Sequence, residues 1–268
     1  MRKIIYILPL LIIAFSCGKS SKNESVKAQQ SIKSAKIKTM KVVQFSYKFG
    51  KPDPASAKTL LTTEFDNRGN SVKEVSPYNI LTYAYKDINK VNKLSDIQEL
   101  NTQALLQFQT NFEYADNGAI TATRFTVDGD VVTKTVMQRD KSDRDTSVVV
   151  YDKRGVINSK KINRFDDIGL KESITYNSND SISNKIVRLS GDKKQRVFII
   201  YNELGVATSV FTENYDSDDN MVEYMNAVED LSGFRHFKRT YKNGLLQEEI
   251  EFQRNGEPKS VIKYTYEK

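Results

Sequence analysis

The sequence YDKRGVINSKKINRFDDIGLKES, residues 151–173, contains the same short phrase twice. An aromatic residue, an Asp, two variable residues and a Gly occupy residues 151–155 and again 165–169. An Asp at the start of a type I turn accepts a hydrogen bond from the backbone N–H two residues later. The Gly supplies the left-handed conformation that a type I turn plus bulge requires. Each copy therefore predicts one strand and one chain reversal.

The phrase recurs through most of the chain, and between copies the residues alternate with period two, as in Leu170, Glu172 and Ile174. Its aromatic residues repeat about every 12 residues, a spacing typical of strands and too short for helical repeats. Weaker copies occupy residues 176–180 and 215–219, and the shorter pairs at 128–129 and 243–244 fit two-residue primed turns. The glycines predicted to form structural turns are Gly69, Gly118, Gly155, Gly169, Gly205, Gly244 and Gly256.

This pattern predicts an all-β domain over residues 41–268, an antiparallel meander of about 14 to 16 short strands forming one curled or folded sheet. One segment breaks the period. Ser95 and Gln98 fit a capping box, and apolar residues then follow a helical stripe, which predicts a short helical insertion over residues 96–107. Residues 220–233 stay in register with the strand period, so we expect a strand there rather than a helix.

The strands do not predict a membrane-spanning barrel. Spanning strands need about 9–11 residues and an unbroken apolar outer face. The stretches between turns here are about 7–9 residues long, and both of their faces carry polar or charged residues.

The amino terminus has the three parts of a secretory signal peptide, which we place at residues 1–16. Arg2 and Lys3 precede an apolar run that is shorter than the roughly 20 residues of a membrane span. The run ends at Cys17, the only cysteine in the chain. With no second thiol in the chain, we expect no internal disulfide.

Residues 14–17, AFSC, resemble the lipobox of bacterial lipoproteins in the looser form found in Bacteroidota, although Phe15 departs from the strict pattern. The resemblance implies that Cys17 is acylated and becomes the first mature residue, so that a covalent lipid anchors the protein to a membrane. It further implies a cell-envelope location, at the outer membrane and facing the periplasm. Residues 17–40 are rich in Lys, Ser and Gln, which predicts a flexible tether behind the lipidated Cys.

The net charge of +7 lies in the first forty residues, where eight basic residues face Glu24 alone. The remaining body is neutral and mixes both signs. Neutralising a phosphate backbone requires a concentrated basic surface. We therefore expect no nucleic-acid partner.

The aromatic-Asp-x-x-Gly phrase resembles YD (RHS-type) repeats and, more loosely, MORN-like hairpin repeats, over about residues 60–266. Large RHS proteins form a shell around a cargo, and this chain is too short to enclose one. The resemblance therefore implies a sheet and no activity.

A calcium-like spacing occurs in the weaker copy at 215–219, where Asp216, Asp218 and Asn220 fit positions one, three and five of an EF-hand loop. The Gly expected at position six and the Glu expected at position twelve are replaced by Met221 and Ala227. The pattern favours an acidic hairpin turn over a weak calcium site.

The chain offers little catalytic chemistry. It has one histidine, His236, and its only thiol is at the predicted lipidation site, which leaves no His/Cys metal centre and no nucleophile pair. We expect a non-enzymatic envelope lipoprotein without a cofactor beyond its lipid, whose sheet face binds a protein or glycan. The alternatives are a hydrolase of envelope polysaccharide, with catalytic carboxylates that the pattern does not identify, and an immunity or antitoxin-like protein.

Overall fold

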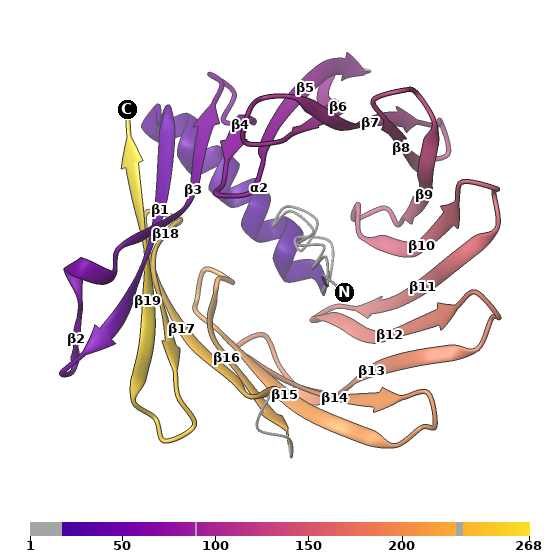
Figure 1. The fold of residues 1–268 in the computed structure, drawn as a ribbon. Coiled ribbons are helices and arrows are strands. Elements are labelled where there is room, and N and C mark those ends of the chain that lie inside the picture. Colours follow the sequence, from indigo (N-terminus) through magenta and orange to yellow (C-terminus); the bar gives the residue numbers. More distant parts are fainter. Residues whose placement is uncertain (1–17, 89, 229–232) are drawn as a thin grey trace, which may run out of the picture.

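The computed structural model describes residues 18–88, 90–228 and 233–268 and is drawn in Figure 1. Its elements are an α-helix, α2 (Gly18–Ala35), a short 3-10 helix, η1 (Pro54–Ser56), and nineteen strands. The strands are β1 (Thr39–Lys48), β2 (Lys51–Pro52), β3 (Lys58–Phe65), β4 (Ser71–Val75), β5 (Ile80–Ile88), β6 (Val91–Leu100), β7 (Leu106–Tyr114), β8 (Ile120–Thr126), β9 (Val131–Arg139), β10 (Asp145–Asp152), β11 (Ile157–Asp166), β12 (Gly169–Asn177), β13 (Ile182–Gly191), β14 (Gln195–Asn202), β15 (Ala207–Tyr215), β16 (Met221–Val228), β17 (Arg235–Lys242), β18 (Leu245–Phe252) and β19 (Pro258–Glu267).

The strands close into an antiparallel barrel. From β3 to β19 each strand pairs with the next in sequence, and β1 pairs with β3 on one side and β19 on the other. Of the described strands, eighteen form this ring, and β2 is a two-residue partner of β1 (Figure 1). The predicted all-β class and antiparallel order are correct, but the predicted open or folded sheet is wrong. The alternating pattern specifies which strands are sequence neighbours, and it carries no signal that the first and last strands also pair.

The repeated phrase forms the turn that its chemistry requires. After β3, Asp66 Oδ1 accepts hydrogen bonds from the backbone N–H groups of Arg68 (2.8 Å) and Asn70 (2.9 Å). The Gly69 N–H donates to the Asp66 carbonyl at 3.0 Å. All the glycines predicted to occupy turns have positive φ, namely Gly69, Gly118, Gly155, Gly169, Gly205, Gly244 and Gly256. In the two weaker copies an Asp takes the left-handed position, at Asp180 and Asp219.

The two predicted primed turns have different outcomes. Asn243 and Gly244 have φ values of 54° and 72°, as a two-residue type I′ turn requires. Gly129 instead closes a three-residue turn, because its N–H donates to the Thr126 carbonyl at 3.1 Å. That second primed-turn prediction is wrong.

The helix predicted over residues 96–107 is also wrong, because β6 and β7 meet there in a hairpin. Asn101 Oδ1 accepts from the backbone N–H groups of Gln103 and Leu105, and Ala104 has φ 61°. The turn is thus another copy of the phrase, with Asn in place of Asp and Ala in place of Gly. The helical stripe in the sequence was a coincidence of apolar residues on two strands. The strand predicted within residues 220–233 is confirmed as β16.

A helix occupies the region predicted to be a flexible tether. α2 ends in a Schellman motif, in which the Ile37 N–H donates to the Ile32 carbonyl (3.0 Å) and the Lys36 N–H donates to the Lys33 carbonyl (3.1 Å). Lys36 takes the left-handed position, with φ 56°. In the described part of the chain, no helix is long and apolar enough to cross a membrane.

The wall of the barrel is a single layer with a thin core. The accessible surface is 16667 Å², against roughly 11,900 Å² for a compact chain of this mass. Directly opposed residues of paired strands share one face of the wall. Phe65 packs against α2, so its face is the inner one, and the register extends that face to Glu74 and Leu81. The buried side chains of the wall lie mainly on this inner face, whose polar members include Thr63, Glu74 and Ser173.

Glu74 provides a test of the wall's burial, because burial raises the pKa of its carboxyl and the nearby Tyr83 lowers it by less. A group whose pKa is raised on folding contributes stability that is full below its ordinary pKa and is lost as the pH rises through the raised value. We expect Glu74→Gln to stabilise the protein by about 1 kcal/mol at neutral pH, a gain that vanishes below about pH 4.

Urea unfolding across this pH range measures the effect. Glu64→Gln, which changes an exposed carboxylate on the outer face of β3, is the matched control and should leave the pH profile unchanged. A stability difference between the parent and Glu74→Gln that is the same at acidic and at neutral pH would contradict the burial of Glu74.

Candidate functional site at the helix-closed end

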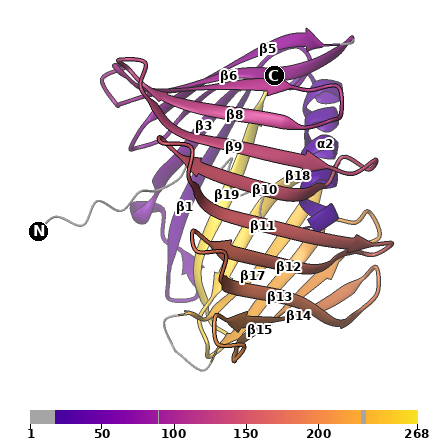
Figure 2. The same cartoon turned by 90° about the vertical axis from the view of Figure 1, so that its right-hand side faces the viewer.

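α2 lies across one end of the barrel. Figure 1 shows the helix within the ring, and Figure 2 shows it beside one set of strand ends. Its neighbours are the β3–β4 and β17–β18 turns, whose Gly69 and Gly244 face α2 residues directly. An 18-residue helix is about 27 Å long, which is enough to reach from this side of the mouth toward β12.

The carboxyl-terminal half of α2 is held by an apolar cluster. Ile32 and Ile37 are buried against Phe65 at the end of β3 and Leu245 at the start of β18. Ile37 follows the Schellman motif, so the turn that ends the helix also places this side chain against the wall. The sequence did carry a signal for this helix, because Ala28, Ile32 and Ala35 share one stripe at helical spacing. The stripe is too short to stand out from its Lys- and Ser-rich surroundings.

Polar contacts hold the middle of the helix. Gln29 donates from its side chain to Asn70 Oδ1, and Asn70 is fixed by Asp66 and by Asn92. Lys27 donates to the backbone carbonyl of Asp218 in the β15–β16 turn. Turns at separate points of the rim therefore bind one helix.

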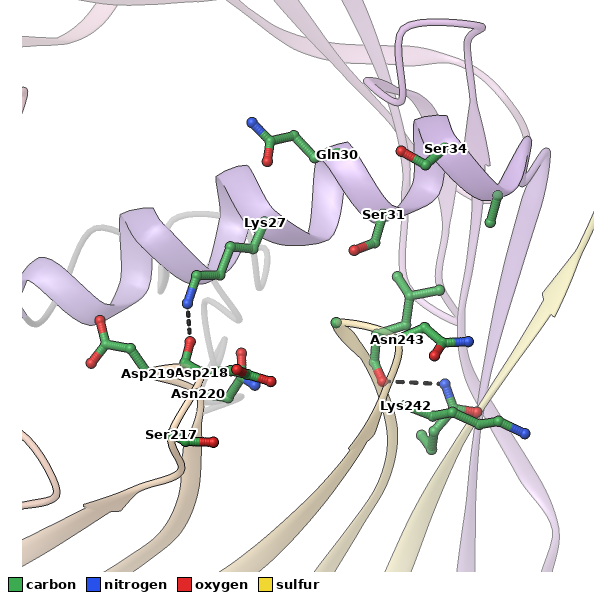
Figure 3. Close-up of a pocket in the computed structure, with 14 residues that line it drawn as sticks. Lys27, Gln30, Ser31, Ser34, Ser217, Asp218, Asp219, Asn220, Lys242 and Asn243 are labelled. Atoms are coloured by element: carbon green, nitrogen blue, oxygen red, sulfur yellow. Dashed lines mark hydrogen bonds between the residues drawn. The ribbon is translucent and has the colours of Figure 1, made fainter.

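A cavity of about 1010 Å³ lies between α2 and two turns (Figure 3). Its lining carries hydroxyl, amide, ammonium and carboxylate groups, and Figure 3 shows Lys27 reaching from α2 to the β15–β16 turn. The lining residues are Lys27, Gln30, Ser31, Ser34 and Ala35 of α2, Ser217, Asp218, Asp219 and Asn220 of the β15–β16 turn, and Lys242, Asn243, Gly244, Leu245 and Gln247.

Two of the calcium-like residues, Asp218 and Asn220, lie in the wall of this cavity, but together with Asp216 they form a turn. Asp216 Oδ1 accepts from the N–H groups of Asp218 and Asn220, both at 2.9 Å, and Asp216 Oδ2 accepts from the Asn220 side chain at 2.9 Å. The Asp66 carboxylate holds Asn70 in the same way. Within the described residues, no group of three or more His, Cys, Asp or Glu side chains is placed to hold a metal ion.

A buried arginine links this turn to the inner wall. The Arg196 guanidinium lies 4.0 Å from the centre of the Tyr215 ring and 3.5 Å from Asp219. The Tyr215 hydroxyl donates to the buried Glu213 carboxylate at 2.6 Å, and Glu213 lies opposite Arg196 on the paired strand. The charges beneath the β15–β16 turn are thus paired within the protein, and this fixes the turn where it meets α2.

The same motif, an arginine stacked on an aromatic ring and paired with a carboxylate, recurs along the inner wall. Arg124 lies 4.0 Å from the Phe108 ring centre and 2.7 Å from Glu99. Arg239 of β17 pairs with Glu249 at 2.7 Å and lies over Phe237. Stacking and pairing together keep a planar guanidinium in one orientation. The lumen wall is therefore polar and charge-balanced at these points.

Four aromatic residues of the inner wall pack against one another and do not offer a platform for sugars. Phe198, Phe211, Tyr224 and Phe237 form a ladder across β14 to β17, with ring centres 4.8, 5.6 and 5.1 Å apart. Phe198 and Phe211 are only 2% and 4% exposed. Their faces are covered by neighbouring rings, so they stabilise the wall rather than offer a platform.

The only histidine lies away from the cavity, on the outer face of β17. His236 Nε2 is 2.9 Å from Glu223 Oε1, and its ring stacks on Phe252. Burial acts to raise the pKa of Glu223, but hydrogen bonds from His236 and Asn214 and the charge of Lys238 lower it overall. This geometry is a half-buried structural pair.

Comparisons with known proteins give fold-level likenesses only. No protein-family model matches the sequence, and no curated protein matches it. A porin-like protein from Bacteroides uniformis shares 11% identity over 86% of this chain and 98% of its own, with a TM-score of 0.46. A porin-like protein from Bacteroides vulgatus shares 11% identity over 85% and 97%, with a TM-score of 0.26.

A protein from Bacteroides fragilis, described as exported and as having a YmcC-like fold, shares 10% identity over 86% of this chain and 95% of its own, with a TM-score of 0.22. The YD and MORN-like repeats are not shown by these comparisons. At such identities and TM-scores, the likenesses establish neither a family nor a function.

Gly69 provides a test of the contact between α2 and the rim. A Cβ at Gly69 would lie 2.5 Å from the Gln29 carbonyl oxygen, whereas a Cβ at Gly118 would meet no atom within 4 Å. Their φ values are 80° and 82°, so both substitutions carry the same backbone strain. We expect Gly69→Ala to destabilise the protein by about 1–2 kcal/mol more than Gly118→Ala.

Thermal unfolding of the two variants measures this difference, and limited proteolysis between residues 26 and 38 reports whether α2 has left the rim. Equal melting temperatures with equal cleavage would show that α2 does not pack on the β3–β4 turn.

Proposed function

We propose that the protein is a lipoprotein of the bacterial cell envelope, acylated at Cys17, whose barrel binds a neutral or weakly charged glycan in the cavity beneath α2 without catalysing a reaction. The observation that carries the proposal is the lining of the 1010 Å³ cavity, which is dense in hydroxyl and amide groups. Cys17 lies outside the described residues, and its acylation rests on the lipobox resemblance of residues 14–17.

The charges of the cavity support an uncharged ligand. Lys27 and Lys242 are balanced in the lining by Asp218 and Asp219. Ser, Gln and Asn side chains both donate and accept hydrogen bonds, as the hydroxyl groups of a sugar do. The volume lies at the upper end of the range for small-molecule sites, which suits an oligosaccharide better than a single sugar.

The carboxylates of the cavity favour binding over hydrolysis. A glycosidase needs two carboxyl groups that flank the scissile bond from opposite sides. Asp218 and Asp219 are neighbours on one turn, and Asp219 faces the Arg196 guanidinium. No arrangement in the described chain favours the immunity alternative over glycan binding.

The described chain begins at the helix-closed end of the barrel, where the cavity lies. Gly18, the first residue of α2, follows Cys17 directly. Acyl chains on Cys17 would therefore hold the cavity end close to the membrane, where glycans attached to envelope lipids are concentrated.

Cys17→Ser tests the anchor. We expect this variant to move from the membrane pellet to the soluble envelope fraction, because several acyl chains on one residue are needed for stable attachment. Fractionation with and without detergent and mass spectrometry of the amino-terminal peptide measure the change. Unchanged, detergent-dependent association of the variant would contradict lipidation as the anchor.

Gln30→Leu tests the cavity. Gln30 is an exposed cavity-lining residue of α2, so the substitution removes a hydrogen-bonding side chain at little cost to stability. We expect the affinity for the best oligosaccharide on an envelope-glycan array to fall about tenfold, since the substitution leaves a sugar hydroxyl without a hydrogen-bond partner. Lys33→Ala, on an exposed α2 position outside the lining, is the matched control. If calorimetry gives Gln30→Leu the same affinity as the parent protein, the glycan binds elsewhere. If no glycan on the array binds the parent protein, the proposal is wrong.

A further inference from the structure

The end of the barrel opposite α2 has a different surface. Hairpin connections alternate between the two ends, so the β1–β2, β4–β5, β6–β7, β8–β9, β10–β11 and β14–β15 connections stand away from α2 (Figure 2). Each of these carries a large apolar side chain exposed to water. We name this set the apolar rim: Phe49, Tyr78, Leu105, Val127, Val156 and Leu204.

The exposure is high and concentrated at this end. Phe49 is 93% exposed and Leu204 is 79% exposed. At the α2 end, the turns carry Asp, Asn and Lys, and outside α2 itself the exposed large apolar side chains among the described residues are Val91 and Leu189. Single exposed apolar residues need no explanation, but their concentration on successive turn tips of one rim marks an interaction surface.

Phe49 adds an independent observation. Phe49 and Gly50 form the two-residue connection between β1 and β2, with φ values of 51° and 72°. A two-residue turn with both φ values positive favours Asn at its first position, and a bulky side chain there is strained. An exposed aromatic ring held at this position costs stability, which indicates that the ring serves something other than folding.

We propose that the apolar rim inserts into the interfacial region of a lipid surface. The tips are separated by polar turn residues and stand around a ring, so two such rims meeting end to end would place their apolar area at the periphery and leave no buried centre. A lipid interface requires no contiguous patch, because each side chain enters the acyl boundary by itself. Tyr is enriched at this depth, and Phe and Leu are among the apolar residues that interfacial helices bury there.

Cations lie beside two of the rim side chains, whereas Asp128, Asp130 and Glu203 lie beside Val127 and Leu204. The Lys48 ammonium lies over the Phe49 ring, and Lys153 and Arg154 precede Val156 in its turn. Cations beside inserted side chains lie at the depth of lipid phosphates. Cys17 precedes Gly18 of α2 in the sequence, so with the proposed anchor this lipid surface would be a second one, distinct from the membrane that holds the acyl chains. The inference is independent of the proposed glycan site.

The test uses the chain beginning at Gly18, which lacks both the apolar leader and the acylated Cys. Every strand pairing and every α2 contact that the structure describes joins residues from 18 onward, so this chain retains them, and its melting transition checks that it folds. Binding to phosphatidylethanolamine–phosphatidylglycerol vesicles is measured by flotation of the vesicle-bound protein.

The rim variant is Leu105→Ser with Val206→Ser, the latter an exposed apolar residue beside Leu204 in the same β14–β15 turn, and the control is Val91→Ser with Leu189→Ser. These residues are matched in exposure, at 58% and 56% against 55% and 55%. We expect the rim variant to lower the vesicle partition coefficient about tenfold and the control to leave it unchanged. An absence of vesicle binding, an equal loss in both variants, or a rim-dependent dimer without lipid would each overturn the proposal.

Phe49→Asn separates lipid binding from folding. A residue kept for stability would lower the melting temperature when replaced. Asn is favoured at this turn position, so we expect a higher melting temperature together with a several-fold weaker partition into vesicles. Retention of full vesicle binding by this variant would overturn the role of the Phe49 ring.

Discussion

The structure depends on the double pairing of β1. Lys41 lies opposite Thr265 of β19 and opposite Thr62 of β3, so one strand joins the two edges of the sheet. The pairing begins at Lys38, one residue before the start of β1. The Lys38 N–H donates to the Glu267 carbonyl and the Lys38 carbonyl accepts from the Phe65 N–H, both at 2.8 Å. A sheet closed in this way has no unpaired edge along which another chain could add.

The position of α2 follows from this closure. β1 enters the ring at the end where the β3–β4 and β17–β18 turns lie, and the Schellman motif at Lys36 reverses the chain just before it. The helix therefore lies over that mouth. Ile32 and Ile37 pack it against the wall, and Gly69, which has no side chain, leaves room for its backbone. One end of the barrel becomes a cavity beneath a helix, lined in part by hydroxyl and amide groups, and the turns at the other end expose apolar side chains to water. The two proposed activities follow this difference between the ends.

The sequence predicted the local structure well because its signals are local. The Asp at the start and the Gly at the end of each phrase specify a turn within five residues, and Asp66 and Gly69 form it as expected. Asn101 and Ala104 form the same turn with weaker residue types, and for that reason the β6–β7 hairpin was predicted as a helix. Closure was beyond such reasoning, since the pairing of β1 with β19 joins residues more than two hundred positions apart. The cavity was missed with it, because α2 and the β15–β16 turn meet only in the closed ring.

Engineered disulfides at β1 test closure most directly, in a Cys17→Ser background that has no other thiol. One variant carries Lys41→Cys with Thr265→Cys, and the other carries Lys41→Cys with Thr62→Cys. Each pair is opposed across neighbouring strands, at a separation that a disulfide can span. The closed barrel predicts that both pairs oxidise in the folded protein, as seen by a gel shift under non-reducing conditions. Formation of only one of the two disulfides would show that the sheet is open at β1 and would contradict this account.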